Sequence, residues 1–455
     1  MRIIQQGDKQ TLDILAKQMV VSKDLRPLLY CTQVKVEDGV LLLNQMTMEL
    51  LLLSEKELPE FFVSDYAHNH WFSVPKDTCE KELVECVRKT LAVTEENKDL
   101  HKDLMYLIFT TTSCNARCPY CYEIGHHTNI SMTQDVAEKT ADFILERTGE
   151  HQGVCLMWMG GEPLLNTKVM DSICNRMAAA GKSYYSSIAT NAYRIDDHII
   201  EKMVGLWRMK SVQITIDGLE EEYNAVRRYT DPSAKTESPF IRVLSNIEKL
   251  LDAGIGVKIH PRINENNGED ICTLIGLLYK KFGCRKNLTV KISGYYQRDH
   301  QRNFPYSKAT EKIITQYQIE AMKMCFKFGY TKPKLAKKMK ITHCNPDRNR
   351  QINILPDGKL GWCDNVIDRD FLGTVESQKL DETLIRKYKT RMPDLPECST
   401  CPHYPACIRL NCCLANLPWC TPERRRLRSY DIEAAMIYKY RKMLTKGKYE
   451  RIIFE

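Results

Sequence analysis

Residues 105–121 read MYLIFTTTSCNARCPYC, a largely apolar run followed directly by three cysteines. The run predicts a buried strand over 105–112. Cys114, Cys118 and Cys121 then share one short loop with the spacing CX3CX2C. Three thiolates on one loop can hold three irons of a [4Fe–4S] cluster and leave the fourth iron without a protein ligand. A zinc knuckle is the alternative, because zinc also takes clustered thiolates.

The chain from 105 to 295 alternates between strand-like and helix-like segments. Strands are predicted at 105–112, 154–161, 183–191, 211–218, 256–264 and 288–295. Helical periodicity lies between them, for example at 133–148 and 238–254. Six βα units in series predict a parallel sheet with crossover helices. The polar motifs follow the strands, at the end where βα barrels build their active sites.

Length and composition define a soluble, globular chain. Its 455 residues suffice for about three domains at roughly 150 residues each, with 43% apolar residues for a core. No apolar run reaches about 18 residues and the N-terminus lacks the apolar core of a signal peptide, so we expect no membrane contact and a cytoplasmic location.

The net charge of +8 is concentrated locally. Residues 331–350 carry seven Lys and Arg against one acid, and residues 421–455 carry ten against five. This excess suits an anionic partner such as an acidic peptide, or else only solvated faces. Aromatic residues are not interleaved with the basic ones, so no nucleic-acid partner is predicted.

Nineteen cysteines, in a reducing compartment, indicate metal ligands rather than disulfides. Three form the loop above and eight lie between 344 and 420. We expect the scattered ones to be small buried apolar residues. They are Cys31, Cys79, Cys86, Cys155, Cys174, Cys272, Cys284 and Cys325.

A second motif ends the second predicted strand, where glycines permit close approach of the backbone. It is Gly160-Gly161-Glu162-Pro163, one βα unit after the cysteine loop. With these two motifs and an aromatic residue, Tyr120, directly before the last loop cysteine, the sequence resembles the radical S-adenosylmethionine (SAM) superfamily. The resemblance implies an α/β fold with a partial (βα)6 TIM-like barrel, a [4Fe–4S] cluster that binds SAM, and contact between the GGEP stretch and the SAM amino group.

Polar residues after the third and fourth strands extend the resemblance. The segment from Asp217 to Arg227 is similar to the family's DG…HD…R pattern, with Tyr223 and Asn224 in place of His-Asp. The resemblance implies that Arg227 pairs with the SAM carboxylate, although the adjacent Arg228 leaves the register open. Turn and capping chemistry is the alternative for these residues. The expected SAM contacts are Tyr120, Gly160, Gly161, Glu162, Pro163, Thr190, Asn191, Thr215, Asp217 and Arg227.

The C-terminal cysteines resemble the SPASM domain, the two-cluster extension of radical SAM enzymes that modify peptides and proteins. The pattern is CX13GX4C, then CX2CX5CX4CC, then a last cysteine. The resemblance assigns Cys398, Cys401, Cys407 and Cys420 to a distal auxiliary cluster. It assigns Cys344, Cys363 and one or both of Cys412 and Cys413 to a proximal one, which either uses both members of that pair or keeps an open iron. Paired zinc sites are the alternative. Asp364 follows Cys363 and, by resemblance to sulfatase-maturing enzymes, is a candidate proton acceptor.

The predicted organisation has five parts. They are an N-terminal module of hairpin and helices (1–100), the radical SAM partial barrel (101–300), a helical linker (301–343), the SPASM region (344–425) and a basic C-terminal helix (426–455). QVKV-EDG-VLLLN predicts a hairpin at Asp38–Gly39, and residues 78–93 predict a helix. MTMELLLL adds a strand or starts a helix.

The resemblance implies an oxidoreductase that matures ribosomally made (RiPP) peptides. It would abstract a hydrogen from a precursor peptide and install a thioether or another crosslink. Implied partners are a precursor with a leader sequence, held by the N-terminal module, and a flavodoxin or ferredoxin-type electron donor. A maturase of protein side chains, of the sulfatase formylglycine type, is the alternative enzyme, and a non-catalytic iron–sulfur protein is the alternative of another class.

Overall fold

The computed structural model describes residues 1–18, 24–63, 71–99, 103–121, 129–149, 153–295, 307–339, 341, 350–363, 370–377, 379–389, 395–405, 407 and 420–445. Four predicted site residues lie outside these ranges: Cys344, Asp364, Cys412 and Cys413.

Six parallel strands form the central sheet, as the alternation predicts. They are β7 (Leu104–Phe109), β8 (Val154–Met159), β9 (Tyr184–Thr190), β10 (Met209–Ile214), β11 (Gly256–Ile259) and β13 (Leu288–Val290). They lie side by side in chain order, and every neighbouring pair is parallel. All carboxyl ends therefore meet at one edge of the sheet. Each strand ends one to five residues before its predicted limit, because the polar residues that follow belong to the loops of the site.

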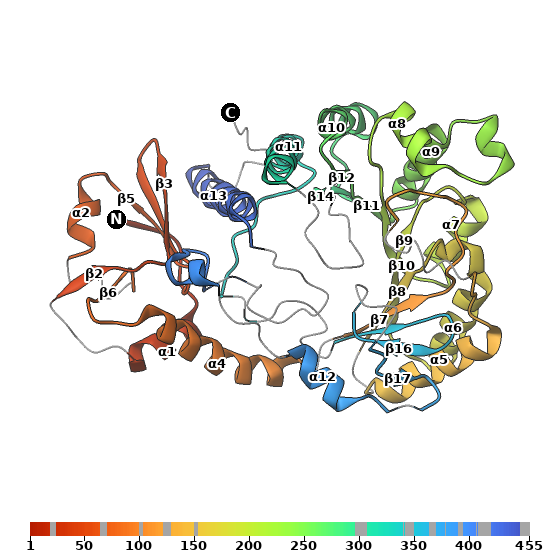
Figure 1. Cartoon of the computed structure of the whole chain (residues 1–455), viewed down its shortest axis with the longest axis horizontal. Coiled ribbons are helices and arrows are strands. Elements are labelled where there is room, and N and C mark those ends of the chain that lie inside the picture. Colours follow the sequence, from red (N-terminus) through yellow and green to blue (C-terminus); the bar gives the residue numbers. More distant parts are fainter. Residues whose placement is uncertain are drawn as a thin grey trace.

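Helices cover one face of this sheet. They are α5 (Gln134–Arg147), η1 (Pro163–Asn166), α6 (Thr167–Ala179), α7 (Asp197–Val204), α8 (Glu220–Arg227), η2 (Pro232–Lys235), α9 (Pro239–Asp252) and α10 (Gly268–Phe282). Figure 1 shows α5, α6 and α7 on the outer side of the strands, while the other face of the sheet is turned toward the N-terminal unit. Local sequence sets these helices: α9 begins where Ser238 accepts a hydrogen bond from the Ile241 amide, with Pro239 in the first turn.

Three more strands extend the sheet beyond β7. They are β15 (Gln351–Ile354), β16 (Lys359–Gly361) and β17 (Gly373–Thr374). β15 pairs in parallel with β7, and β16 pairs antiparallel with β15. The chain therefore leaves β16 toward the amino ends of β7 and β15, so Cys363 lies near the edge opposite to the cysteine loop. Two short strands, β12 (Arg262–Ile263) and β14 (Ser293–Gly294), pair beyond β11 and β13.

The N-terminal unit is a small antiparallel sheet with helices. Its main strands are β1 (Arg2–Gln5), β3 (Cys31–Val36), β4 (Gly39–Asn44) and β5 (Leu50–Leu53), in the order β1-β5-β4-β3. The predicted hairpin is confirmed, since Val36 pairs with Gly39 across a two-residue turn, and MTMELLLL contributes a strand. The remaining elements are α1 (Lys9–Gln18), β2 (Leu25–Pro27), α2 (Glu57–Phe61), β6 (Ser73–Pro75) and α4 (Glu80–Asp99).

Elements from the C-terminal part of the chain pack against this N-terminal unit. They are η4 (Pro396–Thr400) and α13 (Pro422–Leu444), whereas α11 (Lys308–Lys327) packs between α10 and α13 and α12 (Glu382–Lys389) packs on the core of the barrel. Met436 and Tyr440 of α13 share an apolar cluster with Leu41, Leu43 and Leu50, and α13 lies beside β3 in Figure 1. Although α13 is rich in basic residues, one of its sides therefore covers the N-terminal sheet. Among the described residues, no helix has both the length and the apolar character needed to cross a membrane.

Candidate active site

The cysteine loop is fixed by backbone hydrogen bonds to the end of α8. Arg117 N donates to the carbonyls of Arg227 and Arg228 at 3.1 and 3.2 Å, and Thr230 N donates to Asn115 O at 2.9 Å. A bridge between Ala116 and Tyr229 adds a further pairing. The loop that follows the first strand of the barrel is therefore tied to the segment after the fourth strand, so that the thiols and Arg227 lie together.

Two of the three thiols have a hydrogen-bond donor nearby. Ala116 N lies 3.4 Å from Cys114 Sγ and Arg227 Nη1 lies 3.6 Å from Cys118 Sγ. In the absence of metal, burial and the nearby Glu162 raise the pKa of Cys114 to about 12. A metal must therefore displace the proton, which is the usual coupling between thiolate ligation and pKa. Among the described residues, no three His, Cys, Asp or Glu side chains are close enough to hold a single metal ion, and no described cysteine forms a disulfide.

The GGEP turn packs directly on the backbone of this loop. A Cβ on Gly160 would lie 2.3 Å from Thr111 O, and one on Gly161 would lie 2.4 Å from Ser113 O. Gly160 also has a φ of +131°. Only glycine permits this approach, so both glycines are required for the cradle between β7 and β8 that a SAM amino group would enter.

The side chain of Glu162 is buried and forms hydrogen bonds within the protein. Its side chain is 1% exposed and accepts hydrogen bonds from Thr190 Oγ1 at 2.7 Å and Asn191 N at 2.8 Å. Burial raises the pKa of this carboxyl. Glu162 thus joins the ends of β8 and β9. The backbone carbonyls of Glu162 and Pro163 are also bonded within the protein, to Leu165 N and Thr110 Oγ1.

Asn191 continues this network to the cysteine loop. Its Nδ2 donates to Asn115 Oδ1 at 2.7 Å, while Asn115 Nδ2 is buried without a partner. A buried donor without a partner is costly in a folded protein, so it marks a place where a ligand oxygen fits. The predicted residues at 160–163, 190 and 191 are therefore brought together beside the thiols.

Ala192 follows Asn191 where the family usually has glycine, and its φ of +59° lies in the left-handed region. The Ala192→Gly variant removes about 1–2 kcal/mol of backbone strain but loses a buried methyl group and chain rigidity worth a similar amount. We expect an almost unchanged free energy of unfolding in urea. The control Ala141→Gly, at a fully buried helical site, should cost about 2 kcal/mol, and equal losses at both positions would contradict the strain argument.

Asp217 is the centre of a buried polar cluster. Its Oδ2 accepts Arg227 Nη2 at 3.1 Å and the Tyr120 hydroxyl, and its Oδ1 accepts Arg262 N at 2.9 Å. Arg227 also donates to Thr215 O at 2.8 Å, which leaves its buried Nε without a partner. The guanidinium expected to pair with SAM is thus paired with Asp217, and Nε is the donor that it retains for a ligand.

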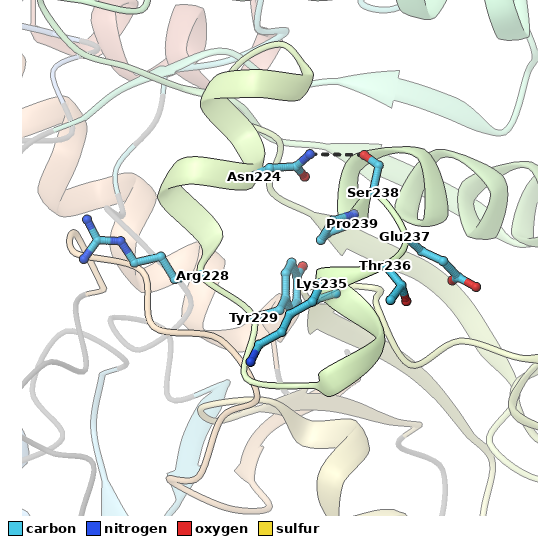
Figure 2. Close-up of a pocket in the computed structure, with 9 residues that line it drawn as sticks. Asn224, Arg228, Tyr229, Lys235, Thr236, Glu237, Ser238 and Pro239 are labelled. Carbon is cyan, nitrogen blue, oxygen red and sulfur yellow. Dashed lines mark hydrogen bonds between the residues drawn. The ribbon is translucent and has the colours of Figure 1, made fainter.

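The structure distinguishes Arg227 from Arg228 by their exposure to solvent. Arg227 is 8% exposed, whereas Arg228 is exposed with a φ of +46°. Arg228 lines a hollow of about 330 Å³ between α8 and α9, which Figure 2 shows together with Lys235. None of the predicted SAM contacts lines this hollow.

Tyr223 and Asn224, which replace the family's His-Asp, have structural contacts. Tyr223 is buried and its hydroxyl lies 3.0 Å from that of Tyr229. Asn224 bonds Ser238 Oγ and the Phe240 amide, so it caps α9 (Figure 2). His260 is likewise hydrogen-bonded, with Nε2 2.7 Å from Ser293 Oγ.

The four cysteines predicted for the distal cluster lie in one region, whereas Cys363 packs on the core of the barrel. Burial raises the pKa of Cys401, and Cys398, Cys407 and Arg425 lie near enough to influence it. Arg425 Nη1 in turn lies 3.4 Å from Cys420 Sγ. Arg425 is therefore close to both Cys401 and Cys420. Of the scattered cysteines, Cys155, Cys174 and Cys325 are buried as expected and Cys31, Cys86 and Cys272 are partly buried. The expectation is wrong for Cys79 and Cys284, which are exposed in the connections before α4 and after α10.

The cysteine-rich segment is seated on the N-terminal unit. Arg88 of α4 donates to Pro405 O at 3.0 Å and its guanidinium lies 4.9 Å from the Tyr404 ring centroid. His403 contacts Gln45 at 3.3 Å and Ser429 of α13 at 2.9 Å. The sequence pattern does not predict the contacts with Arg88 and Gln45, because they join segments more than 300 residues apart.

Comparison with known proteins defines the class. Residues 108–278 match the family model described as the radical SAM superfamily, so this chain contains a radical SAM domain, as its motifs predict. The GTP 3′,8-cyclase of Clostridium perfringens (strain SM101 / Type A) is 30% identical over 185 residues, covering 39% of this chain and 53% of the cyclase. The chain thus spans about half the length of that relative.

Two further proteins are similar. The S-adenosylmethionine-dependent nucleotide dehydratase of Psychrobacter lutiphocae (strain DSM 21542 / CCUG 56590 / IMMIB L-1110) is 23% identical over 245 residues, covering 49% of this chain and 80% of the dehydratase. The solved structure of native anSMEcpe with bound AdoMet and Cp18Cys peptide aligns with a TM-score of 0.54 and 16% identity, over 76% of this chain and 99% of that one. It shares the fold beyond the radical SAM domain.

Proposed function

We propose that this chain is a radical SAM peptide maturase, which abstracts a hydrogen from a ribosomally made precursor and installs an oxidative modification, with a thioether or another crosslink favoured. The observation that carries the proposal is the pairing of an open three-thiol loop at one edge of the barrel with a cysteine-rich segment seated on a separate N-terminal sheet. The fold shared with peptide-bound anSMEcpe over 76% of the chain supports it.

The donor set fits the proposed cofactors. Cys114, Cys118 and Cys121 would hold the [4Fe–4S] cluster, and the cradle at Gly160–Pro163 would receive the SAM amino group, with the two orphan donors of Asn115 and Arg227 beside it. When bound and reduced, the cluster and SAM supply a 5′-deoxyadenosyl radical. The contribution of the chain is to orient SAM between β8 and β10 and to hold the loop rigid through Arg117 and Thr230.

Two auxiliary clusters complete the proposal. Cys398, Cys401, Cys407 and Cys420 would hold the distal cluster, and Cys363 with Cys344, Cys412 and Cys413 the proximal one. They would accept the electron left on the oxidised peptide, and Asp364 would accept a proton. A flavodoxin or ferredoxin-type protein would supply electrons, and the location would be cytoplasmic.

Coexpression with a short Cys-containing reading frame beside the gene tests the function. Mass spectrometry of that peptide should show a loss of two hydrogens per crosslink. An unchanged mass with an inverted residue would mean epimerisation instead. Release of 5′-deoxyadenosine without any change in a peptide would contradict the proposal, and a modified sulfatase side chain would support the alternative maturase.

The outer edge of β3 is the proposed site for the leader peptide. No strand among the described residues pairs with this edge, and β3 spans Cys31–Val36. Because Val36 and Gly39 flank a two-residue turn, they form a hydrogen-bonded pair, and the peptide groups of Gln33 and Lys35 point outward. An extended leader would add to this edge as a further strand.

Substitution of Gln33 tests this edge directly. Gln33→Pro removes one outward amide without touching the bonds to β4, so labelled precursor should bind at least about tenfold more weakly in fluorescence anisotropy. Gln33→Ala keeps the amide and should bind like the wild type. Equal binding by all three proteins would exclude β3 as the leader site. Deletion of residues 1–100 is a poorer test, because Gln45 and Arg88 also hold the cysteine-rich segment.

A further inference from the structure

The inner face of the barrel carries cations on its last strands. Val257, Ile259, Leu288 and Val290 are buried in the core under the helices. Side chains alternate along a strand, so the residues between them lie on the opposite, inner face. Those residues are Lys258 of β11, which pairs with Thr289 of β13, together with His260 and Lys291.

Lys258 and Lys291 are joined by a third cation, Arg262 of β12, which follows β11 closely in the chain, and the three are close enough to repel one another. Burial lowers the pKa of Lys291, and Lys258 and Arg262 lower it further. Burial together with the same cations lowers the pKa of His260 to about 3, so this imidazole is neutral at physiological pH. Lys258, Arg262 and Lys291 have no ion-pair partner among the described residues. Like charges gathered without a counterion destabilise the empty protein, which favours an anionic ligand.

The opposite wall of the same face is apolar. Leu107 and Phe109 of β7 are buried in a cluster with Leu355, while Met105 of β7 and Met157 and Met159 of β8 pack on it and are only partly buried. The strands between them present neutral inward side chains, Ser187 of β9 and Gln213 of β10. None of the described inward positions of β7 to β13 carries Asp or Glu. The strands therefore present an apolar half and a cationic half. Asp217, after the end of β10, bonds the Arg262 amide, but its charge is paired with Arg227.

We propose that Lys258, Arg262 and Lys291 bind an Asp or Glu side chain of the peptide substrate inside the barrel. The proposal rests on the proposed function and adds a specificity to it: the substrate carries an acidic residue within a few positions of the residue that is modified.

An acidic peptide fits both halves of this face. A short peptide presents apolar side chains to the methionines of β7 and β8 and a carboxylate to the lysines three to five strands away. A nucleotide carries its charge on a polyphosphate and has no side chain for the apolar wall. The cations also lie on β11 to β13, whereas the GGEP cradle follows β8, so the SAM amino group and the proposed carboxylate occupy different parts of the sheet.

A peptide selection with the full-length, reconstituted holoenzyme tests the proposal. The probe is a random pool of acetylated, amidated pentapeptides, which have no terminal charges, incubated anaerobically with SAM-bound protein. Wild-type protein should enrich Asp and Glu by about tenfold over the pool. The Lys258→Gln/Lys291→Gln variant should lose this enrichment, and Lys258→Glu/Lys291→Glu should enrich Lys and Arg instead.

Controls separate the outcomes. Lys280→Gln removes one charge on the outer helix α10, where the side chain is exposed, and should select like the wild type. SAM affinity and iron content should be unchanged in the inner variants, since these lysines lie outside the cradle.

Weakened SAM binding would overturn the proposal and assign the cations to SAM, and tight GTP binding without acidic enrichment would overturn it in favour of a nucleotide. The selection measures binding alone, so a protein that selects acidic peptides but never modifies one would refute the proposed function and not this site.

Discussion

Replacement of Cys118 by alanine should abolish SAM cleavage and remove the iron of one cluster. Cys118 is the middle thiol of the loop, and its sulfur lies 3.6 Å from Arg227 Nη1. Two cysteines leave two cluster irons without a protein ligand, so the cubane should not persist. Release of 5′-deoxyadenosine under dithionite should fall at least about 1,000-fold, because the remaining chain has no other route to the radical.

Iron counting distinguishes this loop from the auxiliary thiols. The Cys118→Ala protein should lose about four irons per chain while its remaining visible absorption still bleaches on reduction. The exposed Cys79 provides the control, since Cys79→Ala should keep all iron and full SAM cleavage. Retention of iron together with SAM cleavage in Cys118→Ala would overturn the assignment of the loop, and colourless protein with bound zinc would favour the zinc knuckle.

The parallel sheet and the cysteine loop were predictable because their signals are local. Apolar runs such as 105–112 and 154–161 give strands, the alternation with helices gives parallel order, and CX3CX2C falls within eight residues. The cap of α9 by Ser238 and the hairpin before Gly39 follow from turn chemistry in the same way.

The parts that were not predicted depend on contacts between distant segments. β15 has only four residues and no distinctive pattern, and it belongs to the central sheet only because it pairs in parallel with β7. The contact between the Arg88 guanidinium and the Tyr404 ring joins two segments that share no motif. The pairing of Arg227 with Asp217 is similar, because ten residues of sequence do not show that both side chains turn into the same buried space.

The inner cations illustrate a signal that was present but incomplete. Lys258 and His260 alternate with buried apolar residues, so their common face follows from the strand period. The clustering of positive charge does not follow from the strand period, since Lys291 lies beside Lys258 only because of the register between β11 and β13. The sequence therefore predicts on which face of the sheet each residue lies, and the order of the strands determines which of these residues are neighbours.

Replacement of Asp217 by alanine should cost about 3–5 kcal/mol of the free energy of unfolding, because it leaves the buried Arg227 charge without its counterion. The Tyr120 hydroxyl and the Arg262 amide lose their acceptor at the same time. Urea titration of the anaerobic holoenzyme measures this loss, and deoxyadenosine release should fall at least about tenfold as the loop between β10 and α8 loosens.

A second substitution distinguishes the lost charge pair from a lost cavity. Asp217→Ala/Arg227→Met removes both charges and keeps an apolar stem at a site where the guanidinium carbon lies 5.7 and 5.6 Å from the Tyr120 and Tyr223 ring centroids, so it should recover a large part of the stability while SAM cleavage stays low. Asp197, exposed on α7 and paired with Lys249, is the matched control, and Asp197→Ala should leave the urea midpoint almost unchanged. If the double variant is less stable than Asp217→Ala, then Arg227 stabilises the fold without Asp217, and the pair is not the element that holds the fourth strand to the cysteine loop.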